Sequence, residues 1–356
     1  FRHWMNTKQN FFDLDLETLK VELKNNGLPE YRALQLWRAF YVDLVSGIDE
    51  VTTFSKSLRA SLAEKIDFGR LCADRRVTSA DQQTVKMLFK LPDGSAIETV
   101  LMHYESRQTL CISSQSGCAM GCVFCATGQM GFARNLSSGE IVEQALVFAR
   151  ELKQSGQPVT NIVIMGMGEP FHNYEAVMAA IGRLNAADGF NLGARRFTIS
   201  TVGLLPMIRR FADEKSQVNL AISLHAANDA LRASLLPIAK KYPLPELIEA
   251  CQYYVNTTHR RLTFEWALIQ SVNDSDQDAI ELATLVKGML CHVNIIPLNP
   301  TKAYQGQATT HERAVAFKNI LDKNGIPCTI RLRRGIDINA GCGQLASEDQ
   351  LKTGVL

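Results

Sequence analysis

The residues with the most distinctive chemistry are three cysteines on one short stretch of the chain. Cys118, Cys122 and Cys125 have the spacing C-x3-C-x2-C and lie between Gly117 and Gly128. Three thiolates at this spacing can bind three irons of a 4Fe–4S cluster, which leaves the fourth iron open. An open iron can chelate a substrate, whereas a cluster that only carries electrons has a fourth protein ligand. The pattern therefore favours substrate chemistry over simple electron transfer.

Zinc is the main structural alternative for these thiols. Cys111 could complete the four thiolates that a closed zinc site requires. Zinc ligands, however, usually come as two short cysteine pairs, and Cys111 stands seven residues before Cys118 inside a predicted strand. The spacing therefore favours the iron–sulfur cluster over zinc.

Two glycine-rich segments carry further candidates for chemistry. Gly166-Met-Gly168-Glu169 follows an apolar strand, but it lacks the G-x-G-x-x-G fingerprint of a dinucleotide site. Cys342 lies in Ala-Gly-Cys-Gly-Gln, where the glycines argue against core packing. An isolated cysteine is usually an inert buried residue. We interpret the remaining cysteines in this way: Cys72, Cys251, Cys291 and Cys328.

A repeated alternation of strands and helices must position these residues. After a hairpin around the turn at 92–94, apolar strands are predicted at 110–113, 161–165, 197–201, 219–224, 262–268, 292–297 and 328–332. Helices are predicted between them at 139–154, 173–186, 204–214, 245–256, 276–290 and 311–324. Repeated βα units imply a parallel sheet, either doubly wound or closed into a full or partial barrel. In each case ligands bind at the carboxyl ends of the strands, where nearly all of these motifs fall.

Basic residues in two regions raise the question of nucleic-acid binding. Residues 11–70 are predicted to be helical and carry many Lys and Arg side chains. They form either a solvated helical surface or a small RNA-docking domain. Arg331, Arg333 and Arg334 lead directly into the Cys342 loop, where they could steer phosphates to the site.

Composition excludes several classes of protein. The 356 residues carry 38 Lys and Arg against 36 Asp and Glu, and the net charge of +2 excludes a histone-like polycation. No apolar stretch approaches the length that spans a bilayer, and the first residues lack the features of a secretory signal. We therefore expect a cytoplasmic protein with no membrane contact and no disulfide scaffold. The chain opens on Phe1, and we expect Met5 as a candidate start.

Several motifs together resemble one family. The cysteine motif stands at the end of the first strand of a βα series, and Phe124 precedes its last cysteine. In both respects it resembles the radical S-adenosylmethionine (SAM) superfamily. Segments from about Glu98 to Leu345 further resemble the RlmN/Cfr family of RNA adenine methyltransferases: 109–115, 125–128, 165–170, 200–203, 223–225, 297–300 and 335–345. The match covers most of the chain, and no single motif carries it.

The resemblance implies a fold and a set of cofactors. The fold would be an α/β radical SAM partial (β/α)6 barrel over 84–335, with a small N-terminal helical accessory domain at 1–83 and a catalytic cysteine loop and tail at 336–356. Cys118, Cys122 and Cys125 would hold a 4Fe–4S cluster whose open iron binds SAM. By the same resemblance the SAM contacts are Gly168, Glu169, Ser200, Ser223, Leu224, His225 and Asn299.

The resemblance also implies an indirect route for the methyl group. The C2 and C8 carbons of adenine are electron-poor, so they cannot displace the methyl group of SAM directly. In this family a cysteine, here Cys342, takes a methyl group from one SAM, and a second SAM yields the 5′-deoxyadenosyl radical that abstracts hydrogen from it. The methylene radical adds to the ring, and Glu98 accepts the ring proton. Cys111 then attacks the Cys342 sulfur and releases the product as a transient disulfide forms.

The implied substrates are RNA molecules. The family methylates C2 of an adenosine in 23S rRNA and, for the C2 enzymes, in certain tRNAs. The alternative is C8 methylation of the same rRNA adenosine, which confers antibiotic resistance; Pro170 favours the C2 group, because the C8 enzymes have Ala there. Flavodoxin or ferredoxin is the expected electron donor, and a monomer is expected. A SAM-cleaving enzyme for protein or metabolite is the rival from another class, and it would need neither Cys342 nor an RNA-docking domain.

Overall fold

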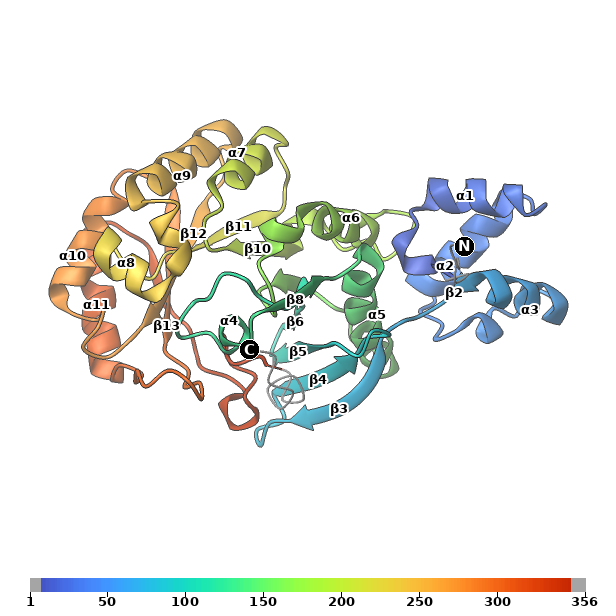
Figure 1. Cartoon of the computed structure of the whole chain (residues 1–356), viewed down its shortest axis with the longest axis horizontal. Helices are drawn as coiled ribbons and strands as arrows, with labels where there is room; N and C mark the ends of the chain where they lie inside the picture. The colour runs from blue at the N-terminus through green and yellow to red at the C-terminus, as the bar shows by residue number, and fades with distance from the viewer. Residues whose placement is uncertain (1–7, 347–356) are drawn as a thin grey trace, which may run out of the picture.

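One ten-stranded sheet organises the structure, a computed structural model that describes residues 8–346 (Figure 1). From one edge to the other its strands are β14 (Cys328–Ile330), β13 (Cys291–Pro297), β12 (Leu262–Leu268), β11 (Asn219–Ser223), β10 (Phe197–Thr201), β9 (Asn161–Ile164), β6 (Arg107–Cys111), β5 (Ala96–Tyr104), β4 (Thr84–Lys90) and β3 (Cys72–Thr78). Every neighbouring pair from β6 to β14 is parallel. Because β14 and β3 are the two edges of the described sheet, the barrel is partial, as predicted. Met5 lies outside the described residues.

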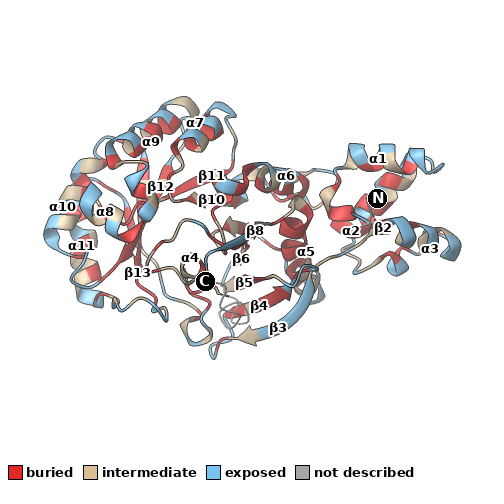
Figure 2. Ribbon diagram, viewed as in Figure 1, coloured by how far each residue is buried: buried red, intermediate tan, exposed pale blue. Residues whose placement is uncertain are grey.

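Helices cover the outer face of the parallel strands. They are α5 (Ser138–Gln154), α6 (Tyr174–Asn185), α7 (Leu205–Asp213), α8 (Asp229–Leu235), α9 (Leu244–Thr258), α10 (Asp276–Leu285) and α11 (His311–Lys323). Their inward faces and the strands are buried, while the outward faces of the helices are exposed (Figure 2). α5 begins in a capping box, in which the Ser137 and Glu140 side chains each accept a hydrogen bond from the other's backbone N–H. α8 was not predicted, because its seven residues are too few to show a helical period.

Three antiparallel strands extend the sheet beyond β6. β4 and β5 form the predicted hairpin, whereas β3 is a strand that the sequence did not indicate. The residues of β3 from Cys72 to Arg76 are exposed, so the strand lacks the apolar alternation that identifies strands in sequence. Because β3 pairs with β4 in the main sheet, we propose that the accessory domain ends before Cys72 rather than at residue 83.

The cysteines outside the cysteine motif differ in their burial. The prediction that Cys72 belongs to the core was wrong, since it is exposed on the edge strand β3. Cys251, Cys291 and Cys328 are buried, and their assignment to the core is confirmed. Cys72 is therefore a surface thiol that can serve as a control position in experiments.

The N-terminal residues form a small unit beside α5. It contains β1 (Gln9–Asn10), α1 (Leu16–Asn25), α2 (Tyr31–Tyr41), α3 (Lys56–Lys65) and β2 (Ile66–Asp67). Its core is aromatic: the ring centroids of Phe11 and Phe40 are 4.8 Å apart, and Phe68 stacks on Phe40 at 5.2 Å. Asp13 accepts hydrogen bonds from Ser138 and Gly139 at the N-terminus of α5, where free N–H groups favour an acidic partner. This contact attaches the unit to the barrel.

The loop that bears Cys118 depends on a glycine with left-handed backbone. Gly117 has a φ of +71°, and a Cβ there would lie 2.0 Å from the carbonyl oxygen of Gly131. Gly156 has a similar φ of +69°, but a Cβ there would have no atom within 4 Å. Both Gly117→Ala and Gly156→Ala carry the left-handed penalty of about 1–2 kcal/mol. We expect Gly117→Ala to lower the thermal unfolding midpoint by roughly 5 °C more than Gly156→Ala, because only Gly117→Ala adds the clash. Equal midpoints in scanning calorimetry would contradict this account of the loop.

Candidate active site

A cavity of about 220 Å³ opens at the carboxyl ends of the parallel strands. Most of the predicted site residues line it: Cys111, Cys118, Cys122, Cys125, Gly168, Glu169, Ser200, Ser223, His225, Asn299 and Cys342. They come from strand ends and from the loops that follow, as expected for a parallel sheet. Cys111 and Cys342, which are 231 positions apart in the chain, face the same space.

The three thiols of the cysteine motif lie between β7 (Gln115–Gly117) and β8 (Phe132–Asn135), and α4 (Ala126–Gln129) begins directly after Cys125. Burial raises the pKa of Cys118 to about 12 and the pKa of Cys122 well above its usual value. A buried thiol keeps its proton unless a metal supplies compensating charge. In residues 8–346, no three His, Cys, Asp or Glu side chains converge on one point as a single metal ion requires. The three thiols line one cavity, as the ligands of one 4Fe–4S cluster must.

Glu169 is fixed in the cavity wall by backbone N–H groups. Its carboxylate accepts hydrogen bonds from the N–H groups of Phe171 at 3.0 Å and Val202 at 2.9 Å. Burial raises its pKa to about 7, although these hydrogen bonds offset part of the shift. Gly168 before it has a φ of +103°, and a Cβ there would come within 2.5 Å of the Gln115 side chain. Glu169 is therefore a positioned acceptor whose charge changes near neutral pH.

The strands after β9 contribute hydroxyl, imidazole and amide groups. The hydroxyl oxygens of Ser200 and Ser223, on neighbouring strands, are 3.4 Å apart. Nδ1 of His225 accepts a hydrogen bond from the Ala267 N–H, and burial lowers the pKa of His225 to about 3, so the ring is neutral. Oδ1 of Asn299 is buried without a hydrogen-bond partner. A buried acceptor of this kind in a cavity wall fits a ligand with donor groups, as SAM has.

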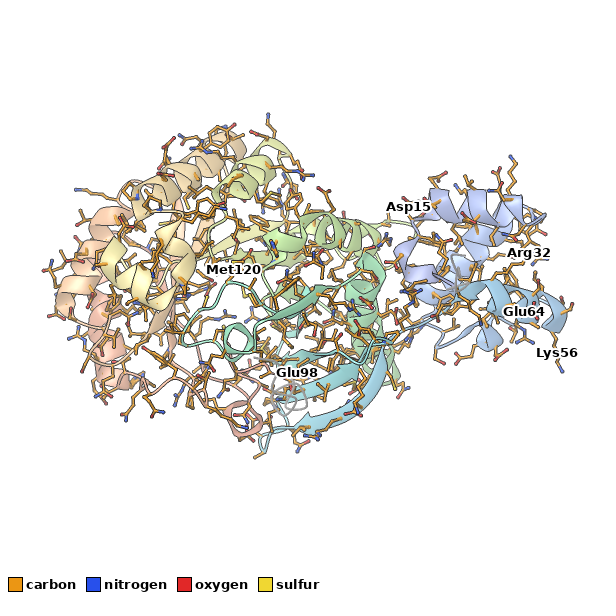
Figure 3. The ribbon with its side chains drawn as sticks, in the orientation of Figure 1. Asp15, Arg32, Lys56, Glu64, Glu98 and Met120 are labelled. Carbon is orange, nitrogen blue, oxygen red and sulfur yellow. The ribbon has the colours of Figure 1, made fainter. Side chains whose placement is uncertain are left out.

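Two predicted residues lie outside this cavity. Leu224 is fully buried, and its side chain belongs to the hydrophobic core, so only its backbone can serve a ligand. Glu98, labelled in Figure 3, lines a neighbouring cavity of about 210 Å³ together with Lys86 and Asn339. Its carboxylate lies 2.9 Å from Lys86 Nζ and accepts a hydrogen bond of 2.9 Å from the Ala346 N–H. Lys86 also donates to the carbonyl of Asn339, so this ion pair contacts both ends of the Cys342 loop.

Cys342 and Cys111 are free thiols in the same cavity. Cys342 is exposed to the open space, yet protein surrounds it, and burial raises its pKa to about 11 while Arg331 opposes the shift. Burial raises the pKa of Cys111 to about 12, and the nearby Cys342 adds to the effect. The Cys111 thiol therefore lies where the charge of a Cys342 thiolate is felt.

The Cys342 loop is also bonded to the cysteine motif and to the loop after β13. Asn299 Nδ2 donates a hydrogen bond of 3.1 Å to the Cys342 carbonyl. The Thr127 hydroxyl, two residues after the last motif cysteine, donates to the Leu345 carbonyl at 2.6 Å. These bonds use backbone atoms of the loop, which leaves the Cys342 sulfur facing the cavity.

Two charged residues of the site were missed by the sequence analysis. Glu265 in β12 is buried, lies 3.7 Å from Arg331 and accepts a hydrogen bond from Asn294 at 3.0 Å. A lone Glu within the apolar run 262–268 was the available signal, because buried charges are normally paired. Lys86 had no signal in the sequence alone, because it follows only from the observed register of the hairpin: Leu88 lies opposite Glu98, and Lys86 is the diagonal neighbour of Glu98 on the same face.

The chain is similar to known proteins along nearly its whole length. Residues 112–283 match the Radical SAM superfamily, and residues 9–67 match the ribosomal RNA large subunit methyltransferase N-terminal domain. The dual-specificity RNA methyltransferase RlmN 1 of Myxococcus xanthus is 48% identical over 95% of this chain and 94% of its own length. The chain belongs to the RlmN family of radical SAM RNA methyltransferases. A probable RlmN of Chloroflexus aurantiacus is 46% identical over 97% of this chain and 94% of its own length.

The RlmN assignment extends to three-dimensional structure. The crystal structure of a radical SAM methyltransferase from Sphaerobacter thermophilus superposes with a TM-score of 0.93 at 51% identity, covering 95% of this chain and 99% of that one. As a radical SAM protein, this RlmN-type chain uses a 4Fe–4S cluster and SAM. Within residues 8–346, no helix is both long and apolar enough to cross a membrane.

Proposed function

We propose that this protein methylates C2 of an adenosine in 23S rRNA and in tRNA, with Cys342 as the methyl carrier. The observation that carries the proposal is the presence of Cys342, Cys111 and the three motif cysteines in one cavity. The relatives, which are described as dual-specificity RNA methyltransferases, support RNA as the substrate. Pro170, at the start of the short helix after Glu169, is typical of the C2 group rather than the C8 group. We further propose a monomeric enzyme that acts in the cytoplasm, where both RNAs occur.

The cavity residues divide into cluster ligands and SAM contacts. Cys118, Cys122 and Cys125 are the proposed cluster ligands. Glu169 would accept a hydrogen bond from the amino group of SAM, and the other proposed contacts are Gly168, Ser200, Ser223, His225, Asn299 and the backbone of Leu224. When bound, these cofactors supply a methyl group in one event and a carbon-centred radical, from a second SAM, in another.

Cys342 acts first as a nucleophile and then as a carrier. Burial disfavours its thiolate, and the Arg331 guanidinium counteracts that effect, so a fraction of thiolate can accept the methyl group. Once the carrier carbon has bonded to the ring, Glu98 takes the ring proton, and the unpaired electron left on the ring would return to the bound cluster. Because Glu98 lies in the neighbouring cavity and accepts a hydrogen bond from Ala346, the Cys342 loop must move before that carboxylate reaches the ring.

Cys111 completes the reaction by thiol–disulfide chemistry. Its thiolate attacks the Cys342 sulfur, so that the S–S bond forms as the S–C bond breaks. The departing carbon keeps the electron pair of that bond and takes a proton, which completes the methyl group. A thiol reductant then restores both cysteines. Both sulfurs face the same cavity, as this step requires.

Glu169→Gln tests the acceptor in the cavity wall. In the cluster-loaded protein at pH 8, SAM should bind about 10- to 100-fold more weakly, since a hydrogen bond to a charged group contributes about 1.5–3 kcal/mol. Glu169 has a pKa of about 7, so its charge is lost as the pH falls through that value. The ratio of variant to wild-type Kd should therefore shrink at pH 6. Equilibrium dialysis at both pH values measures it, and a constant ratio would show that this charge does not hold SAM.

The reaction itself is tested with the anaerobically reconstituted holoenzyme. The enzyme is incubated with SAM, flavodoxin or ferredoxin as the proposed electron donor, and 23S rRNA or tRNA from cells that lack the modification. Nucleoside mass spectrometry should then detect 2-methyladenosine in both RNAs. 8-Methyladenosine would assign the enzyme to the C8 group instead. If 5′-deoxyadenosine forms without either methylated product, the RNA assignment fails while SAM cleavage stands.

A further inference from the structure

A large apolar side chain stands exposed at the mouth of the cavity. Leu332 is 81% exposed, whereas Val21, the next large apolar residue of the described chain, is 57% exposed. Leu332 lines the cavity together with its chain neighbours Arg331, Arg333 and Arg334, so positively charged residues flank it in the chain. An apolar group set among cations at a cavity mouth suits a ligand that combines apolar faces with negative charge.

The backbone around Leu332 is held in place, so the exposed side chain is presented from a fixed position. The Arg331 N–H donates to the carbonyl of Ile295 at 2.8 Å, which continues the pairing of β14 with β13. Arg333 Nη1 donates to the Leu298 carbonyl at 3.3 Å, and Arg334 Nη1 donates to the carbonyl of His103 at 3.1 Å. Residues on both sides of Leu332 are therefore anchored to the barrel.

An arginine–tyrosine stack lies beside this segment. The guanidinium carbon of Arg334 is 4.4 Å from the ring centroid of Tyr104, and that of Arg107 is 4.1 Å from the same centroid. Tyr104 and Arg334 line the cavity, and Arg107 is exposed. Nε of Arg334 is buried without a hydrogen-bond partner, so this group still has a donor to offer a ligand. Guanidinium planes and aromatic rings are surfaces on which single-stranded bases stack.

We propose that Leu332 is a wedge that enters the RNA stack beside the target adenosine, and that the stack of Tyr104, Arg107 and Arg334 receives the neighbouring base. The proposal rests on the proposed function and adds how the target leaves its stack. Chemistry on a ring carbon requires the base to leave its stack and enter the cavity. Apolar side chains are used as wedges between bases in other nucleic-acid-binding proteins. The surrounding arginines favour RNA over a protein ligand, because the backbone phosphates on each side of a wedge are negative.

Leu332→Ala provides the direct test, because an exposed side chain can be shortened without disturbing the core. Two RNAs with the same local sequence are compared under single-turnover conditions, one a folded hairpin with a stacked target and the other an unstructured oligonucleotide. We expect methylation of the hairpin to slow by about tenfold or more and methylation of the unstructured RNA to change by less than about twofold. SAM cleavage without RNA should be unchanged. Leu290→Ala, at a residue that is 51% exposed and does not line the cavity, is the matched control.

A second measurement reads the unstacking without the methylation reaction. 2-Aminopurine in place of the target adenosine becomes brighter when it leaves the stack, and the wild-type and Leu290→Ala proteins should both increase its fluorescence on binding the hairpin. Leu332→Ala should bind with a much smaller increase. Arg107→Ala should weaken binding to both RNAs and reduce the slope of log affinity against log salt by about one.

The outcomes separate this proposal from the function on which it rests. A wild-type protein that methylates neither RNA but still cleaves SAM would refute the proposed function, and the fluorescence measurement would still decide whether Leu332 unstacks bound RNA. If the wild-type protein methylates the hairpin and Leu332→Ala methylates it equally well, the wedge is refuted. The wedge is also refuted if Leu332→Ala slows the methylation of both RNAs by the same factor.

Discussion

Cys342→Ala should lower RNA methylation by more than about 10³-fold while SAM cleavage continues. Alanine has no sulfur to accept the methyl group, so the carrier is lost entirely. The cluster ligands are separate residues of the same cavity, and iron binding should be intact. The loop should keep its position, because Asn299 bonds to the carbonyl of residue 342 rather than to its sulfur.

Two products from one reaction measure this effect. Mass spectrometry of the RNA nucleosides reports methyladenosine, and chromatography of the same mixture reports 5′-deoxyadenosine. Cys72→Ala is the matched control, since Cys72 is an exposed thiol on the edge strand β3, and it should methylate as the wild type does. Iron content should be equal in all three proteins. Methylation by Cys342→Ala above about 1% of the wild-type level would refute the carrier role.

Cys111→Ala should stop the enzyme after one event and leave it covalently attached to its RNA. Without the second thiol, nothing attacks the Cys342 sulfur, and the S–C bond between protein and adenine persists. Multiple-turnover methylation should therefore fall by more than about 10²-fold. Cys111 ends β6, and its backbone pairing with β5 and β9 does not involve the sulfur, so the fold should tolerate alanine.

A denaturing gel with labelled RNA shows the adduct as a band of low mobility. The band should disappear on digestion with ribonuclease, and it should be absent in the double variant Cys111→Ala, Cys342→Ala. Wild-type protein should show little of it, because Cys111 resolves the adduct in each cycle. Free turnover by Cys111→Ala without any adduct would show that another group releases the product.

The parallel strands were predictable because burial gives them a strong pattern. β10 has the predicted bounds because the buried apolar residues Phe197 and Ile199 alternate with polar ones. β12 has them because most of its residues are apolar and buried. The meeting of Glu169 and Cys342 at one cavity was predictable as well, because the carboxyl ends of parallel strands lie at one edge of the sheet. The motifs therefore could be placed together before any contact was known.

Features that depend on exposure and side-chain direction were not predictable. β3 is an exposed edge strand whose polar residues carry no period, so neither the strand nor the exposure of Cys72 was detected. The resemblance named Leu224 as a SAM contact, but residues of a strand point alternately to opposite faces, and its side chain points into the core. For the same reason the place of Glu98, paired with Lys86 in a neighbouring cavity, required the actual register of the hairpin.

The bonds that hold the Cys342 loop also set an order for the maturation of the protein. Thr127 and Leu345 are 218 positions apart, and Glu98 and Ala346 are 248 positions apart. Contacts of such separation form late in folding, because closing a long loop costs chain entropy. The three motif thiols come from one short stretch, so they can take up iron before the loop covers them. We therefore expect the cluster to assemble before the Cys342 loop closes over it. Pulse-labelled hydrogen exchange should find the amides of 341–346 among the last to gain protection.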